Sequence, residues 1–202
     1  MLTFSKQLFA LCTAVVLAPS MGAAQSACPT ADMLNGNGIL FTQDNGDFEI
    51  HQLAPNGSIL QRADYDGFAS VNYIVHGVHV LQLSDEENGR ILPDSIWLFY
   101  FGMPISDLPK PVAGGTWSAT TTQTHFGSSE RETVRHRWGR MTSYSIGNCT
   151  MDAIPVTVKY SSADYNHTEE AMYFPDLGTA ILTGYADSEG RDDYTFVDVR
   201  GN

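Results

Sequence analysis

Basic side chains are scarce in this sequence. The chain of 202 residues has 11 lysines and arginines against 23 aspartates and glutamates, which gives a formal net charge of −12. A surface with this excess of negative charge repels phosphate backbones and anionic membranes. The composition therefore disfavours nucleic-acid binding, although acidity by itself identifies no partner.

The sequence also lacks the motifs of the common catalytic centres. It contains no His-Glu-x-x-His zinc motif and no Gly-x-Ser-x-Gly nucleophile turn. The acidic segment DSEGRDD, residues 187–193, lacks the alternating order of a calcium-binding loop. We interpret this segment as the turn of a hairpin. No sequence motif in the chain indicates a cofactor.

A run of apolar residues near the N-terminus is too short to cross a bilayer as a helix, and no later segment is long and apolar enough to do so. Lys6, the apolar stretch 8–18 and the small residues 22–24 are together typical of a signal peptide. We expect residues 1–24 to be removed on export, leaving residues 25–202 as a single domain in the periplasm or outside the cell.

Cysteine is rare, and only Cys28 and Cys149 remain once Cys12 is lost with the signal peptide. Two cysteines in an oxidising compartment usually pair, so we predict a disulfide between them. The alternative is lipid attachment at Cys28, which lies shortly after the expected cleavage site. Gln25 stands where lipoprotein processing favours leucine or valine, so the disulfide is the preferred prediction.

Helical periodicity is absent after the signal peptide, apart from a turn or two near 31–34. Turn clusters such as Asn45-Gly46 and Asn56-Gly57 separate short runs rich in β-branched and aromatic residues. The predicted strands are 38–43, 48–53, 58–63, 70–83, 96–103, 116–125, 131–145, 153–160, 169–174, 179–186 and 193–199. They predict an all-β antiparallel meander that forms a curved sheet or half-barrel, with a β-sandwich as second choice. The proline- and glycine-rich segment 104–115 is interpreted as an internal connection that crosses between two halves of one sheet system.

The C-terminal stretch AMYFPDLGTAILTGYADSEGRDDYTFVDV, residues 171–199, contains a strand, a Phe-Pro-Asp-Leu-Gly turn and a hairpin, and it follows a strand entered through Gly147-Asn148-Cys149. This pattern resembles small exported bacterial proteins of unknown function. The long meander is more loosely similar to the curved half-barrels of periplasmic lipoprotein carriers. The resemblance implies a cupped sheet able to hold an apolar group, and it implies no functional residue.

Two histidines, His76 and His79, lie three apart in the run YIVHGVHVLQL, residues 73–83. If this run is one strand, their side chains point to opposite faces and are roughly 10 Å apart, too far to share a metal ion. A bulge at Gly77 would bring both onto one face. We favour a structural role for both and keep a metal-dependent hydrolase, built on these histidines and neighbouring carboxylates, as the alternative function.

Two further features suggest a binding site. The segment IWLFYF, residues 96–101, is apolar on both faces, and strand parity places Trp97, Phe99 and Phe101 together. Such a strand is either covered on both sides or part of a sheet that cups an apolar ligand. Arg135 and Arg137 share one strand face, which suits either an anion or simple pairing with acidic residues of other strands.

The leading hypothesis from the sequence is a non-enzymatic binding or carrier module. Trp97, Phe99 and Phe101 would contact an apolar or lipid-like group, and Arg135 and Arg137 would meet an anionic headgroup at the rim. A third possibility is an assembly partner in the cell envelope, whose ligand would be another envelope protein.

Overall fold

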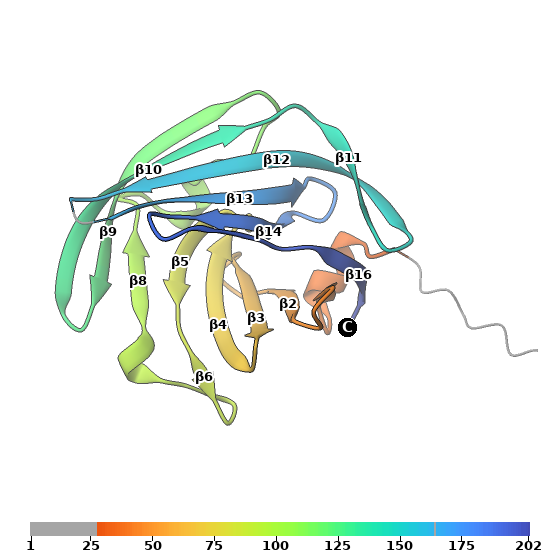
Figure 1. Cartoon of the computed structure of the whole chain (residues 1–202), viewed down its shortest axis with the longest axis horizontal. Coiled ribbons are helices and arrows are strands. Elements are labelled where there is room, and N and C mark those ends of the chain that lie inside the picture. Colours follow the sequence, from red (N-terminus) through yellow and green to blue (C-terminus); the bar gives the residue numbers. More distant parts are fainter. Residues whose placement is uncertain (1–27, 164) are drawn as a thin grey trace, which may run out of the picture.

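The computed structural model describes residues 28–163 and 165–202, so the expected signal peptide lies outside the described residues. The fold is all-β, as predicted: 14 strands form one antiparallel, meander-like sheet that does not close into a barrel (Figure 1). The short remaining elements are the 3-10 helices η1 (Ala31–Asn35), η2 (Pro93–Ser95) and η3 (Ile105–Asp107) and the hairpin of β6 (Glu86–Glu87) and β7 (Arg90–Ile91). In the described part of the chain, no helix is long and apolar enough to cross a membrane.

In the first half of the sheet each strand pairs with the next one along it. Its strands are β1 (Ile39–Gln43), β2 (Phe48–Leu53), β3 (Ile59–Tyr65), β4 (Phe68–Val75), β5 (His79–Leu83) and β8 (Trp97–Tyr100). The prediction of one strand over 70–83 is wrong, because β4 and β5 form a hairpin. His76, Gly77 and Val78 make its turn, and the first two have positive φ (53° and 69°), which is the backbone twist that tight hairpins favour.

The second half contains the longest strands. They are β9 (Thr116–His125), β10 (Ser128–Trp138), β11 (Thr142–Ile146), β12 (Cys149–Ser161), β13 (Asn166–Phe174), β14 (Thr179–Ala186), β15 (Arg191–Asp193) and β16 (Phe196–Gly201). The strand predicted over 131–145 is divided into β10 and β11. Both lie along the same edge of β12, but the register slips by one residue between them. The strand predicted over 193–199 is divided as well, at Tyr194 and Thr195.

The proline- and glycine-rich segment 104–115 lies between β8 and β9, which are hydrogen-bonded neighbours. It therefore leads from the last strand of the first half to the first strand of the second half, within one sheet. Gly114 and Gly115 end the connection, and Trp138 of β10 packs so close to Gly115 that an added Cβ would lie 2.7 Å from its ring. Glycine is thus required where the connection passes beneath the tryptophan.

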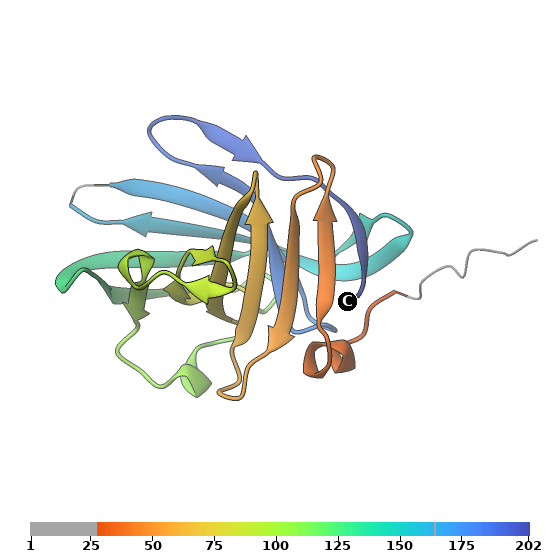
Figure 2. The same cartoon turned by 90° about the horizontal axis from the view of Figure 1, so that it is seen from below.

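The two ends of the sheet meet without forming a continuous ladder. β15 ends one side of the strand order and β16 the other, with only Tyr194 and Thr195 between them in the chain. The Tyr194 amide donates a hydrogen bond to the Thr183 carbonyl of β14, and the Thr195 carbonyl accepts one from the amide of Asp44, just after β1. The sheet is therefore folded back on itself, and its two halves form facing layers (Figures 1 and 2).

The main hydrophobic core lies between these layers on the side of β1 and β16. Ile39 and Phe41 of β1 are fully buried against Phe174 of β13 and Ile181 of β14. Alternation along β1 places these side chains inward, and burial of such residues stabilises the fold by about 1.5–3 kcal/mol each. A tightly packed core on one side leaves the other side of the interlayer space for the site described below.

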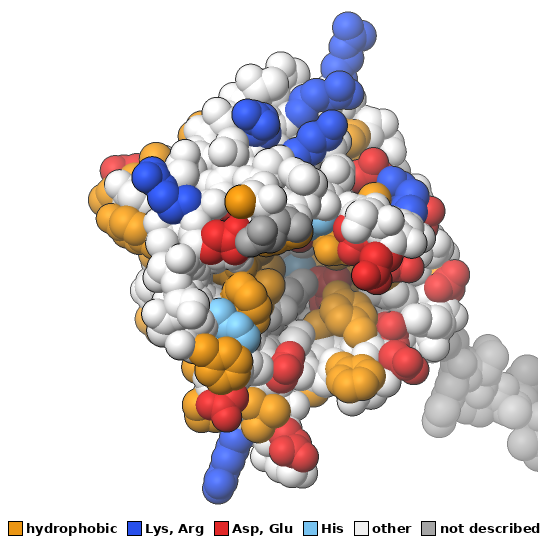
Figure 3. Space-filling model, turned by 60° about the vertical axis from the view of Figure 1, so that its left-hand side comes forward, with side chains coloured by type: hydrophobic (Ala, Val, Ile, Leu, Met, Phe, Trp, Pro, Cys, Tyr) orange, Lys and Arg blue, Asp and Glu red, His pale blue; other side chains and the backbone are white. Residues whose placement is uncertain are grey.

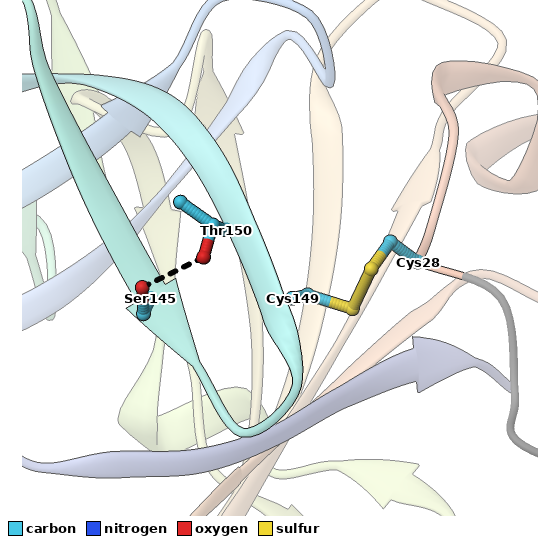
Figure 4. Close-up of a disulfide and its surroundings, with 4 residues drawn as sticks. All are labelled: Cys28, Ser145, Cys149 and Thr150. Carbon is cyan, nitrogen blue, oxygen red and sulfur yellow. Dashed lines mark hydrogen bonds between the residues drawn. A yellow bond between two sulfur atoms is a disulfide. The ribbon is translucent and has the colours of Figure 1, made fainter.

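The predicted disulfide is confirmed: Cys28 is bonded to Cys149 (Figure 4). Cys149 is the first residue of β12, beside the β11–β12 hairpin, whose Ser145 and Thr150 hydroxyls are hydrogen-bonded at 2.9 Å. The bond ties the beginning of the described chain to the second half of the sheet. The lipid-anchored alternative would use this same sulfur, so it is incompatible with the disulfide.

Candidate functional site

A partly open cavity of about 270 Å³ lies between the two layers on the side of β8 and β9. Val80, Leu83, Trp97 and Phe99 line it from the first half of the sheet, and Gln123, Glu132, Tyr160, Tyr165, His167, Glu169 and Tyr185 line it from the second. The lining combines a large apolar and aromatic surface with two carboxyl groups and one imidazole. A concave apolar surface with a few polar groups converging on it is the usual composition of a small-molecule site.

This cavity continues both inward and outward. A deeper compartment of about 160 Å³ shares Val80, Leu83 and Glu169 with it and extends toward Ala180 and Leu182 of β14. An open groove of about 650 Å³ shares Leu83 and Trp97 with it and leads to solvent. Figure 3 faces the resulting hollow, in which hydrophobic and acidic side chains gather. We call these two compartments, without the open groove, the interlayer cavity.

One wall of the interlayer cavity is a stack of aromatic rings. The imidazole of His167 lies parallel to the ring of Tyr160, with ring centroids 4.3 Å apart, and stacks on Tyr185 at 5.2 Å. Tyr165 adds a further ring at 5.6 Å from His167. The three tyrosines come from β12, the β12–β13 turn and β14, so the wall forms only when these strands pair.

Two carboxylates are fixed within this wall by hydroxyl donors. Glu132 accepts hydrogen bonds from the hydroxyls of Thr121 (3.0 Å) and Tyr165 (2.8 Å), and only 2% of Glu132 is exposed. Glu169 accepts one from the hydroxyl of Tyr160 at 3.1 Å. Burial, and then the nearby carboxylates, raise the pKa values of both tyrosines, so their hydroxyls remain protonated donors.

The predicted aromatic contacts are partly brought together. Trp97 and Phe99 line the interlayer cavity, whereas Phe101 does not; it is buried with Val75 and Leu108 in a cluster that Phe99 also contacts. On the other face of β8, Leu98 is 48% exposed, so this strand is not covered on both sides as the sandwich interpretation required. Trp97 lies at the mouth, where its ring stacks on His125 with centroids 4.0 Å apart.

Arg135 and Arg137 lie on the opposite face of the sheet from the interlayer cavity. Along β10 they alternate with inward-facing Val134 and His136, and they border a groove on the outer face with Lys159. Neither arginine takes part in an ion pair within the described residues. This position separates them from Trp97 and Phe99, so they do not form a rim of the same site.

His76 and His79 are closer than the single-strand prediction allowed, because the hairpin brings their ring centroids to 6.4 Å. His79 is buried, its Nε2 is hydrogen-bonded to the Pro109 carbonyl at 2.8 Å, and its ring lies 4.6 Å from that of His136. No bulge forms at Gly77, which is a turn residue. Within the described residues, no group of three or more histidine, cysteine, aspartate or glutamate side chains is placed to hold a metal ion.

The buried His79–His136 pair predicts a loss of stability in acid. Burial lowers the pKa of His79 to about 4 and that of His136 to about 3. Below the usual imidazole pKa the unfolded chain therefore binds protons that the folded chain does not, so stability is complete above that pKa and falls as the pH drops. Both ring nitrogens of His136 lack hydrogen-bond partners among the described residues, so His136→Leu removes no hydrogen bond. The variant should therefore escape the part of the acid-induced loss of stability that His136 causes, which is about 2 kcal/mol at pH 5.

Urea unfolding of the wild type and His136→Leu at pH 7.5 and pH 5 measures this difference. His125→Leu is the matched control, because His125 lies at the open mouth and its replacement should leave the acid loss unchanged. Equal acid losses in the wild type and His136→Leu would show that His136 does not titrate as its burial implies.

A second polar cluster is fully buried beneath the deeper compartment. His51 is hydrogen-bonded through Nε2 to Glu49 (2.6 Å) and through Nδ1 to the Thr179 hydroxyl (2.8 Å). This order of hydroxyl, imidazole and carboxylate has the connectivity of a hydrolase triad. Thr179, His51 and Glu49 are at most 1% exposed, so no substrate reaches the hydroxyl, and the cluster holds strands β2 and β14 together instead.

Comparison with family models, with curated proteins and with solved structures finds no match. The function is therefore argued from the cavity alone. The sequence analysis identified Trp97 and Phe99 but missed the wall built from Tyr160, Tyr165, His167, Glu169 and Glu132. One signal was present: Glu132 has the same strand parity as Val134 and His136, which puts a carboxylate on the apolar face of β10.

Proposed function

We propose that the protein is a non-enzymatic binding or carrier module that holds a small, largely apolar ligand in the interlayer cavity. The observation that carries this proposal is continuity: the two compartments share Val80, Leu83 and Glu169, and Trp97 connects them to the open groove. A path from solvent to an apolar interior is what a binding protein requires. The main core is packed elsewhere, so the fold does not depend on filling this space.

The hydrolase alternative is not carried further, because no observation favours it. His76 lies in a turn, His79 is hydrogen-bonded to a backbone carbonyl, and the triad-like cluster of Thr179 is enclosed. We retain export to an oxidising compartment as part of the proposal. The disulfide supports it, since structural disulfides form and persist in such compartments.

Titration with Nile red, a neutral apolar dye, tests the binding proposal. The wild type should bind the dye with enhanced fluorescence, and Val80→Trp should weaken binding by about tenfold or more, because Val80 lines both compartments and the larger ring fills them. Leu98→Trp is the matched control: Leu98 is half-exposed on the outer face of β8, and its replacement should not affect the dye.

Thermal unfolding of both variants shows whether each remains folded. Organic extraction of the purified protein followed by mass spectrometry then identifies any ligand retained from its source. Dye binding that is absent in the wild type, or unchanged by Val80→Trp in the folded protein, would contradict the proposal.

A further inference from the structure

The charge of the interlayer cavity is of one sign. Glu132 and Glu169 lie in its lining, and Asp85 and Asp94 border the open groove. Glu130 borders a second groove, which shares Trp97 and Gln123 with the cavity. Among the described residues, no lysine or arginine lines either compartment or either groove. Figure 3 shows the same separation, with acidic side chains in the hollow and lysine and arginine outside it.

The two carboxylates, Glu132 buried and Glu169 a quarter exposed, are hydrogen-bonded but not neutralised by a lysine or arginine. The donors to Glu132 are the hydroxyls of Thr121 and Tyr165, both uncharged. Glu169 has the Tyr160 hydroxyl and, more distantly, His167 Nε2 at 3.6 Å. Full burial of a carboxylate without an opposite charge is costly, so a cation beside Glu132 would be favoured, and the partly exposed Glu169 would add to the attraction.

The aromatic wall adds a second attraction for the same kind of charge. Tyr160, Tyr165 and Tyr185 present rings to the cavity, and Trp97 and Phe99 present theirs from the opposite half of the sheet. Aromatic faces carry negative potential and attract ammonium groups, most strongly where water is excluded. Rings on two sides and carboxylates between them form the kind of aromatic cage that recognises substituted ammonium groups.

We infer that the ligand of the interlayer cavity is an organic cation, a molecule whose amine or substituted ammonium group lies between Glu132 and Glu169 while its apolar part lies along Val80 and Leu83. This inference rests on the proposed binding function and specifies the class of its ligand. A cationic ligand takes the place of the anionic headgroup in the earlier hypothesis, because Arg135 and Arg137 lie on the other face of the sheet.

Three probes with one phenyl skeleton test the sign of the charge: phenethylamine, phenethyl alcohol and hydrocinnamate, which are positive, neutral and negative at pH 8. Isothermal titration at low salt should show the amine binding about tenfold tighter than the alcohol, and the carboxylate weakest. Glu169→Gln should weaken binding of the amine by about tenfold and leave that of the alcohol unchanged, because the amide still accepts from Tyr160.

Glu170→Gln is the matched control. Glu170 is the next residue along β13, but it faces outward and pairs with Arg191 at 2.8 Å, so its replacement should not change any of the three affinities. Equal effects of the two replacements, or equal binding of the three probes, would overturn the cation preference. If Nile red binds and the amine does not, the inference fails and the binding function stands; if neither binds, both fail.

Discussion

Replacing Cys28 and Cys149 with alanine should lower the free energy of unfolding by about 4–5 kcal/mol, the largest effect of any change considered for this protein. The bond joins residues separated by 121 positions, so it closes most of the described chain into one loop. Cross-linking a loop of this length restricts the unfolded chain far more than the folded one. Urea unfolding of the oxidised wild type and the double variant measures the difference.

The wild type treated with a reductant separates the cross-link from the side chains. Its unfolding midpoint should fall to that of the double variant, and the denaturant dependence should become steeper as the unfolded chain expands. Cys149 is only 4% exposed, so a small packing difference between thiol and alanine is expected to remain. Oxidised and reduced wild type that unfold at the same urea concentration would contradict a stabilising role for the bond.

Most strands were predictable because turn residues and alternation act locally. Asn45-Gly46 and Asn56-Gly57 separate β1, β2 and β3 where the sequence predicted. The prediction of one strand over 70–83 was wrong because the hairpin turn that contains His76 and Gly77 was interpreted as part of a continuous strand. Gly77 is the decisive residue: an added Cβ would lie 2.2 Å from the backbone nitrogen of Ala180 in β14, a contact that no local pattern reveals.

The candidate site was less predictable because it forms between distant parts of the chain. Strand parity identifies the face on which Glu132 or Glu169 lies, but it does not show which strand covers that face. Only the folding back of the sheet brings Trp97 of β8 opposite Tyr160 of β12 and Tyr185 of β14. The same limit applies to the arginines. Strand alternation predicts that Arg135 and Arg137 share one face, but the direction in which the sheet folds back determines that this face is the outer one.

Glu49→Ala should lower the free energy of unfolding by about 3–5 kcal/mol, as expected when the shared acceptor of a buried hydrogen-bond cluster is removed. Glu49 is fully buried, and three groups donate to its carboxylate: His51 Nε2 and Gln61 Nε2, both at 2.6 Å, and the Tyr65 hydroxyl at 2.5 Å. The replacement leaves all three without their acceptor, the fully buried His51 most severely, and it opens space next to the deeper compartment, which Gln61 and Tyr65 line.

Glu86→Ala is the control for this change. Glu86 forms an ion pair with Arg62 at 2.5 Å near the surface, where such pairs contribute at most about 1 kcal/mol. Urea unfolding at pH 7.5 should therefore separate the two variants clearly, with Glu49→Gln between them because its amide oxygen still accepts one of the three bonds. A Glu49→Ala variant as stable as Glu86→Ala would show that His51, Gln61 and Tyr65 find other acceptors, and the buried cluster would then not be what joins β2 to β14.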